Sequence, residues 1–272
     1  MSDFRKQTPR WPLSEFVQCF WYSQGSARPH KFERILPDGS VEVVINLQED
    51  RTRIYDRHSC ALAANVRGAL VSGPRSDYFV IDTAQQLSTI GIHFKPGGAF
   101  PFFGVPATEL QNRQVALHDV WGSAAVEMRD QLLEAPSVDA KFAVLERALL
   151  RRAPDLSRHP AVAFALQEFR PGRGRSVTEV TEQIGITPKR FIQLFQREVG
   201  LTPKLFCRVR RFQKVLHSIG MDGRIEWADV ALGCGYFDQA HFNHDFRAFS
   251  GLNPSTYLAH RTEHLNHVPL HD

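Results

Sequence analysis

The sequence predicts an α+β protein of two domains, the first rich in β-strands and the second entirely helical. Three observations predict this architecture: a length of 272 residues, short strand-like apolar runs over the first hundred residues, and helical periodicity with an internal repeat near the end. The expected domains span residues 1–153 and 159–265, because charged residues and Pro154 interrupt the pattern between Arg151 and His159.

Composition places the chain among ordinary globular proteins. It is 43% apolar and 23% charged, which excludes collagen-like and disordered classes. A net charge of +4 admits nucleic acid as a partner without requiring it. No apolar run approaches the roughly 20 residues of a membrane span, and the N-terminus is polar, so we expect a cytoplasmic protein without a membrane segment. The four cysteines form no C-x-x-C pair and are expected to be packing residues.

The N-terminal strands are short runs of Val, Ile and aromatic residues. They are expected at Phe16–Tyr22, Phe32–Leu36, Val41–Leu47, Val66–Val71, Tyr78–Asp82 and Thr89–Phe94. Turn residues such as Pro37-Asp38-Gly39 and Pro96-Gly97-Gly98 separate several of these runs. Six short strands without intervening helices predict a small barrel or sandwich.

A helical hairpin is expected after the strands. Apolar residues fall at helical spacing over residues 119–134 and again over 137–152, where Ser137 is a candidate N-cap. Two amphipathic helices that meet near Pro136 predict an antiparallel pair. We expect a homodimer interface within residues 119–152.

An internal repeat in the C-terminal half is the strongest signal in the chain. Gly185 recurs as Gly235 at an offset of fifty residues. At an offset of fifty-one, the repeat pairs Phe191 with Phe242, Phe195 with Phe246, and Gly200-Leu201-Thr202-Pro203 with Gly251-Leu252-Asn253-Pro254. One extra residue therefore lies in the turn of the second copy, near Tyr236-Phe237. Each copy predicts a helix, a tight glycine turn and a second helix, which is the helix-turn-helix pattern.

The second helix of each copy is expected to turn a polar face outward while its phenylalanines face the core. Side chains of this kind can contact base edges and phosphates in the major groove. A basic helix at Pro203–Ser218 joins the two copies and carries five cations within eleven residues. The candidate DNA-binding residues are Lys189, Arg190, Gln193, Gln196, Arg210, Arg211, Gln239, His241, Asn243 and His244. The alternative is a helical bundle whose polar faces are only solvated, but the duplication favours DNA binding.

Residues 176–261 resemble the DNA-binding domain of AraC/XylS-type bacterial transcription regulators. The most specific part of the resemblance runs from Gly235-Tyr236-Phe237-Asp238-Gln239 to Asn253-Pro254-Ser255-Thr256-Tyr257. The resemblance implies that helices near residues 188–199 and 239–250 enter successive major-groove segments, and that RNA polymerase is a partner. One departure is His244, where the family often carries Arg. A histidine there is expected to contact DNA more weakly or in a pH-dependent way.

The resemblance also implies a cupin-like N-terminal domain that senses a small molecule and dimerises through a following helix pair. Candidate effector-binding residues are Trp21, Tyr22, Arg34 and His93. The alternative is that the aromatic residues among them are ordinary core residues. For Arg34, the alternative is an ion pair at the edge of a strand.

Enzymes form the rival class. One rival is a small-molecule-binding or cupin-type enzyme barrel with a helical appendage, and another is an Ada-like repair regulator that accepts methyl groups on an activated cysteine. A cupin metal site needs a close His-x-His pair with Glu, which His93 does not provide. We therefore expect no catalytic residues, no metal and no cofactor. The histidines of the tail, at 260, 264, 267 and 271, are expected to lie in a frayed end.

Overall fold

A computed structural model describes residues 3–25, 28–153, 155–170, 173, 175–219 and 225–270. The strands are β1 (Asp3–Gln7), β2 (Val17–Gln24), β3 (Phe32–Ile35), β4 (Glu42–Asn46), β5 (Arg51–Tyr55), β6 (Leu62–Arg67), β7 (Ala69–Ser72), β8 (Phe79–Asp82), β9 (Ser88–Phe94), β10 (Gln114–Ala116) and β11 (His267–Leu270). The helices are α1 (Phe100–Phe103), α2 (Leu117–Trp121), α3 (Ser123–Glu134), α4 (Val138–Arg152), α5 (Pro160–Glu168), α6 (Val177–Ile184), α7 (Pro188–Val199), α8 (Pro203–Ser218), α9 (Trp227–Gly233), α10 (Gln239–Ser250) and α11 (Pro254–His260). Short 3-10 turns include Ala107–Leu110.

The N-terminal half consists of two antiparallel sheets, in a sandwich-like arrangement. One sheet has the order β1-β2-β9-β4-β7-β10, and the other has the order β11-β3-β8-β5-β6. The predicted β-rich fold is therefore confirmed. The short edge strands β1 and β10, the strand β5 and the C-terminal strand β11 were not predicted; charged and polar residues make up much of β1 and β5. The single strand expected at Val66–Val71 is wrong, since Gly68 (φ +75°) separates β6 from β7.

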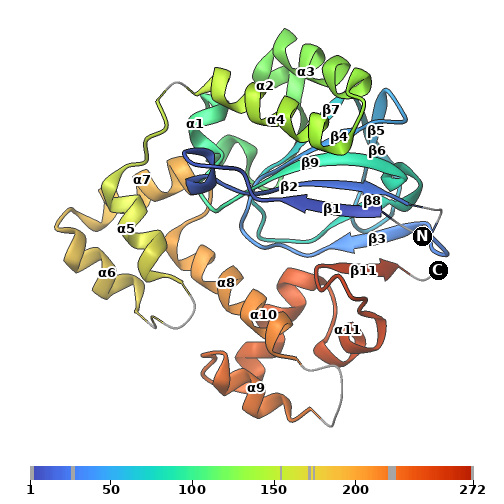
Figure 1. Ribbon diagram of the computed structural model, residues 1–272. Helices are drawn as coiled ribbons and strands as arrows, with labels where there is room; N and C mark the ends of the chain where they lie inside the picture. Colours follow the sequence, from blue (N-terminus) through green and yellow to red (C-terminus); the bar gives the residue numbers. More distant parts are fainter. Residues whose placement is uncertain are drawn as a thin grey trace.

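Helices α3 and α4 cover one face of the first sheet (Figure 1). The ring of Phe142 on α4 stacks on Phe20 of β2 at 6.2 Å between centroids, and Leu145 and Leu149 are fully buried in the same core. Ser137 caps α4 as expected, accepting a hydrogen bond from Ala140 N. The single helix expected at 119–134 is wrong, since Gly122 (φ +62°) separates α2 from α3.

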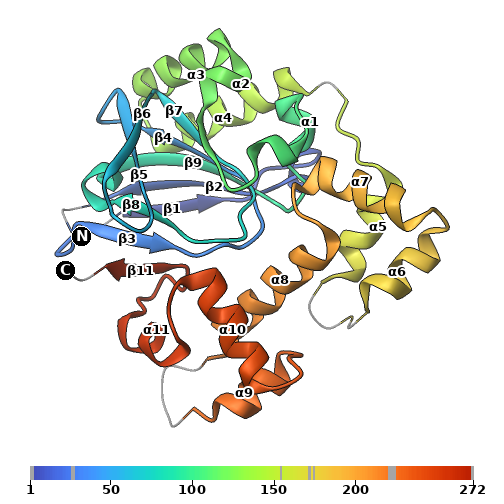
Figure 2. The same ribbon diagram turned by 180° about the vertical axis from the view of Figure 1, so that it is seen from behind.

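The helical half packs against the second sheet, as the two opposite views show (Figures 1 and 2). Val80 and Val268 of this sheet, with Leu36 just after β3, share one apolar core with residues of α7, α8 and α10. The linking helix α8 also contacts the N-terminal half through Gln213, whose Nε2 donates to Pro37 O at 2.8 Å. The predicted boundary near Pro154, a residue outside the described ones, falls between α4 and α5.

The C-terminal tail is a strand of the second sheet, so the expected frayed end is wrong for residues 267–270. β11 pairs with β3, with Val268 opposite Arg34. Val268 is 1% exposed, and its burial outweighs the cost of Pro269 because β11 is an edge strand. His271 lies outside the described residues.

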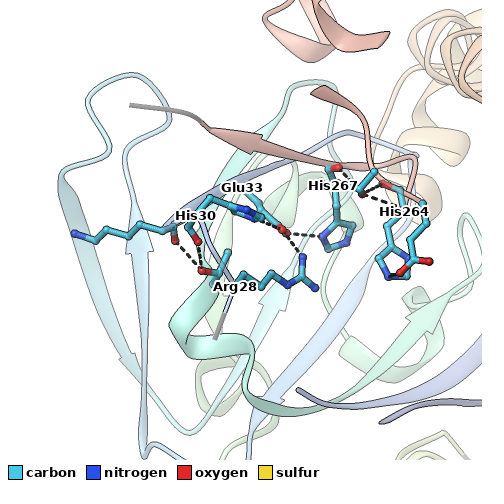
Figure 3. Close-up of polar contacts among 9 residues, drawn as sticks. Arg28, His30, Glu33, His264 and His267 are labelled. Carbon is cyan, nitrogen blue, oxygen red and sulfur yellow. Dashed lines mark hydrogen bonds and ion pairs between the residues drawn. The ribbon is translucent and has the colours of Figure 1, made fainter. Parts of the chain in front are cut away.

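A buried carboxylate anchors this strand. Figure 3 shows Arg28, His30 and His267 around Glu33 of β3, whose side chain is 1% exposed. Glu33 Oε2 lies 3.0 Å from His267 Nδ1, and Glu33 Oε1 lies 2.6 Å from His30 Nε2. Burial alone raises the pKa of Glu33, but hydrogen bonds from His267 and His30 and the charge of Arg28 lower it to about 2. The carboxylate is therefore charged at neutral pH and ties the C-terminal strand β11 to β3.

Candidate nucleic-acid interface

The first helix-turn-helix unit consists of α6 and α7. Ser176 and Glu179 form a reciprocal capping box that starts α6, and Gly185 ends it with a φ of +72°. The side chain of Thr187 caps α7, and Pro188 occupies its first turn, where no backbone N–H is needed. The short turn between the helices therefore follows directly from these residues.

Helix α7 has one apolar face and one polar face. Phe191 and Phe195 are fully buried, and their rings lie 5.8 Å apart. Of the four residues predicted on the opposite face, three are exposed: Lys189, Arg190 and Gln193. The fourth, Gln196, is half-buried. The predicted recognition helix is thus present over Pro188–Val199, with its polar face turned to solvent.

The second unit, α9 and α10, repeats this construction. Gly235 (φ +86°) lies in the turn, and Asp238 caps α10 by accepting a hydrogen bond from His241 N at 2.7 Å. Phe242 and Phe246 are fully buried, as their counterparts in α7 are. The repeat found in the sequence is therefore a repeat in three dimensions.

The outer face of α10 lines a shallow groove. Its walls come from α10 and from the starts of α9 and α11, and its lining residues are Trp227, Gln239, Asn243, His244, Arg247, Ala248, Asn253, Pro254 and Ser255. Three predicted DNA-binding residues therefore share one concave surface. The fourth, His241, is half-buried beside the ring of Tyr236.

Two residues on or near α10 were not among the predicted contacts. Phe237 is 86% exposed, directly before the cap of α10, and Arg247 lies in the last turn of the same helix. The signal for Phe237 was present in the sequence, since it lies where the second copy has its extra residue.

The three arginines of the linking helix α8 lie against other parts of the protein. Arg208 pairs with Asp245 of α10, and the guanidinium of Arg211 lies 4.9 Å from the ring centre of Tyr236. Burial lowers the pKa of Arg210, an effect that the charge of Asp38 in the N-terminal half opposes. Arg210 and Arg211 are therefore only half-exposed.

The four predicted effector residues do not converge on one place. Trp21 Nε1 donates to Glu42 Oε1 at 2.8 Å, and His93 lies between Glu42 (3.5 Å) and Asp38 (3.3 Å). Burial opposes the charged form of His93, but the two carboxylates raise its pKa well above the usual value. Tyr22 is 6% exposed in the apolar core under α4.

Arg34 lies apart from the other three, on the second sheet, with its guanidinium 5.0 Å from the ring centre of Tyr78. The structure therefore brings together Trp21 and His93 only.

The surroundings of Cys207 disfavour thiol chemistry. Burial raises the pKa of the Cys207 thiol to about 11, opposite to the shift that an activated cysteine needs. Cys19, Cys60 and Cys234 are free and at least partly buried, as expected. Within the described part of the chain, no group of three metal-ligating side chains is placed to hold an ion. No helix there has the length and apolar character needed to cross a membrane.

Two family profiles match the chain. Residues 5–116 match a domain of unknown function (DUF6597), and residues 180–260 match a helix-turn-helix domain. The second match covers both units described above, including α7 and α10.

The solved structures that match the chain include two of the ToxT protein of Vibrio cholerae. An apo variant is 11% identical, with a TM-score of 0.43, over 88% of this chain and 97% of that one. Wild-type ToxT bound to an unsaturated fatty acid is 10% identical, with a TM-score of 0.42, over 88% and 93% of the two chains. Among curated proteins, no sequence matches the chain.

Proposed function

We propose that the chain is a DNA-binding transcription regulator of the AraC type, in which α7 and α10 read two successive major-groove segments. The observation that carries this proposal is the repeat itself. Each copy buries its phenylalanines and exposes the polar face of its second helix. Two recognition helices in one chain can span neighbouring turns of DNA, about 34 Å apart, without a second subunit.

Individual roles follow from side-chain chemistry. Gln193, Gln239 and Asn243 have the amide groups that pair with adenine, and all three are exposed. Lys189 and Arg190 lie in the first turn of α7, where cations reach guanine or phosphate oxygens. We propose that His241 and His244 contact the backbone or a base beside them.

Substitution on α7 tests the proposal. Arg190→Ala and Gln193→Ala should each weaken specific DNA binding by about 1–3 kcal/mol and relax the preference at one base position. Arg151→Ala is the matched control, because it removes the same charge from an exposed site on α4. Binding is measured by fluorescence anisotropy on a selected DNA site, with circular dichroism as the check on folding. Unchanged affinity in a folded Arg190→Ala, Gln193→Ala double variant would contradict the assignment of α7 as a recognition helix.

For the N-terminal half, we propose that Trp21 and His93 contact a small polar effector. Their shared partner Glu42 is half-exposed, so a ligand with hydrogen-bond donors can compete for it. A melting-shift screen of wild type and His93→Gln tests this. The proposal predicts a compound that stabilises the wild type and not the variant, and equal stabilisation of both contradicts it. We propose further that the regulator acts in the bacterial cytoplasm, where its DNA lies.

A further inference from the structure

Two glycines occupy equivalent places at the ends of the two recognition helices. Gly200 ends α7 with a φ of +84°, and Gly251 ends α10 with a φ of +71°. Both begin the repeated Gly-Leu-x-Pro segment that leads into the next helix. Positive φ explains why both positions hold glycine, but it does not explain why neighbouring atoms pack so closely against them.

Both glycines lie against the same part of the N-terminal half. A Cβ atom at Gly200 would lie 2.3 Å from Pro74 Cγ and 2.8 Å from Ala107 O. A Cβ atom at Gly251 would lie 2.5 Å from Tyr78 Cε1. Pro74 and Tyr78 are near the two ends of one loop, residues 73–78, which joins β7 to β8.

The turn glycines of the two units provide an internal comparison. Gly185 and Gly235 also have positive φ, yet a Cβ atom at either would meet no described atom within 4 Å. The helix-turn-helix fold therefore does not itself require close packing at its glycines. The close approach is confined to the two that face the loop.

The loop is held firmly on the N-terminal half. Asn112 N donates to Pro74 O at 3.0 Å, and Ser76 N donates to Asn112 Oδ1 at 2.8 Å. The guanidinium of Arg34 lies 5.0 Å from the centre of the Tyr78 ring. The two contact points are thus parts of one braced element, and their separation is fixed.

We propose that the loop 73–78 positions both recognition helices for DNA, by contacting the C-terminal glycine of each. This inference rests on the proposed function. The relative placement of α7 and α10 decides which separation of two major-groove segments the protein accepts. Pro74 and Tyr78 are therefore positioning residues for DNA recognition, although they belong to the N-terminal half.

The test measures affinity of the full chain for a selected site and for versions with one or two base pairs added or removed between its two segments. Wild type should prefer one spacing strongly. Tyr78→Ala should reduce that preference about fivefold or more, while Tyr78→Phe, which keeps the ring, should retain it. A purely structural role would lower stability without changing the ratio between spacings.

Glycine variants keep the test decisive if Tyr78→Ala folds poorly. Gly251→Ala and Gly235→Ala impose similar backbone strain, but only the first collides with the loop. The proposal predicts that Gly251→Ala changes the spacing preference and that Gly235→Ala does not. An unchanged preference in both Gly251→Ala and folded Tyr78→Ala, with DNA binding intact, would overturn the inference alone. Absence of sequence-specific binding at every spacing in wild type would overturn the proposed function and the inference together.

Discussion

Arg208 Nη2 lies 2.6 Å from Asp245 Oδ1, and this ion pair joins the linking helix α8 to the second recognition helix α10. The Asp245 side chain is 1% exposed, and Arg208 is its nearest cationic partner among the ion pairs of the described residues. His241 and His244 on α10 lie 3.8 and 3.7 Å from the same carboxylate. A residue of α8 therefore holds the side of α10 opposite the face that we propose reads DNA bases.

Removal of Arg208 should destabilise the protein strongly. Arg208→Ala leaves Asp245 buried without its main counter-charge, and we expect the free energy of unfolding to fall by about 3 kcal/mol. Lys204→Ala, an exposed change on the same helix, should cost about 0.5 kcal/mol or less. Urea denaturation followed by circular dichroism measures both variants, and equal stabilities would contradict the role given to the pair.

His244→Arg should strengthen DNA binding. The His244 side chain is 77% exposed, so a longer cation can extend from α10 without repacking the core. One added phosphate or guanine contact should make the slope of log affinity against log salt concentration steeper by about one. Anisotropy titrations from low to physiological salt measure the slope. If affinity and slope both stay at the wild-type values, His244 does not face DNA.

Acid should weaken the attachment of the C-terminal strand. The pKa of Glu33 falls from 4.5 in the unfolded chain to about 2 in the folded protein. Its stabilising effect is therefore complete above pH 4.5 and is lost as pH falls toward 2, a loss of about 3 kcal/mol. Glu33→Gln should be less stable than wild type at pH 6, and the difference should shrink on acidification. A difference that stays constant between pH 6 and pH 3 would refute this.

Dimerisation through the helical hairpin remains a prediction. Val126 and Leu133 are 50% and 45% exposed on α3, two helical turns apart, and Leu150 on α4 is 43% exposed. If this face joins two subunits, replacing both α3 residues with Glu should convert a dimer into a monomer. Light scattering at micromolar concentration decides the point, and a wild-type monomer would remove the proposal.

The recognition helices and the linking helix were predictable because local chemistry determines them. Three Thr-Pro or Asn-Pro pairs are helix-start signals in the sequence, and each starts a helix in the structure: Thr187-Pro188, Thr202-Pro203 and Asn253-Pro254. The polar faces of α7 and α10 followed from their phenylalanine spacing, and most of those residues are exposed.

Long-range pairing was not predictable in the same way. β11 depends on contacts between residues more than 200 positions apart, such as His267 with Glu33, and its own four residues include a proline. Arg210 stays a predicted DNA contact, but the sequence did not show that it also lies near Asp38 of the other half. A charge count along one helix does not show which side another domain covers.

Selection of bound sequences from random double-stranded DNA tests the central claim most directly. We expect enrichment of an asymmetric site with two specified segments, about one helical turn apart, for each subunit. Enrichment of a single segment for each subunit would contradict the claim that both α7 and α10 read DNA, and no enrichment would contradict sequence-specific binding altogether.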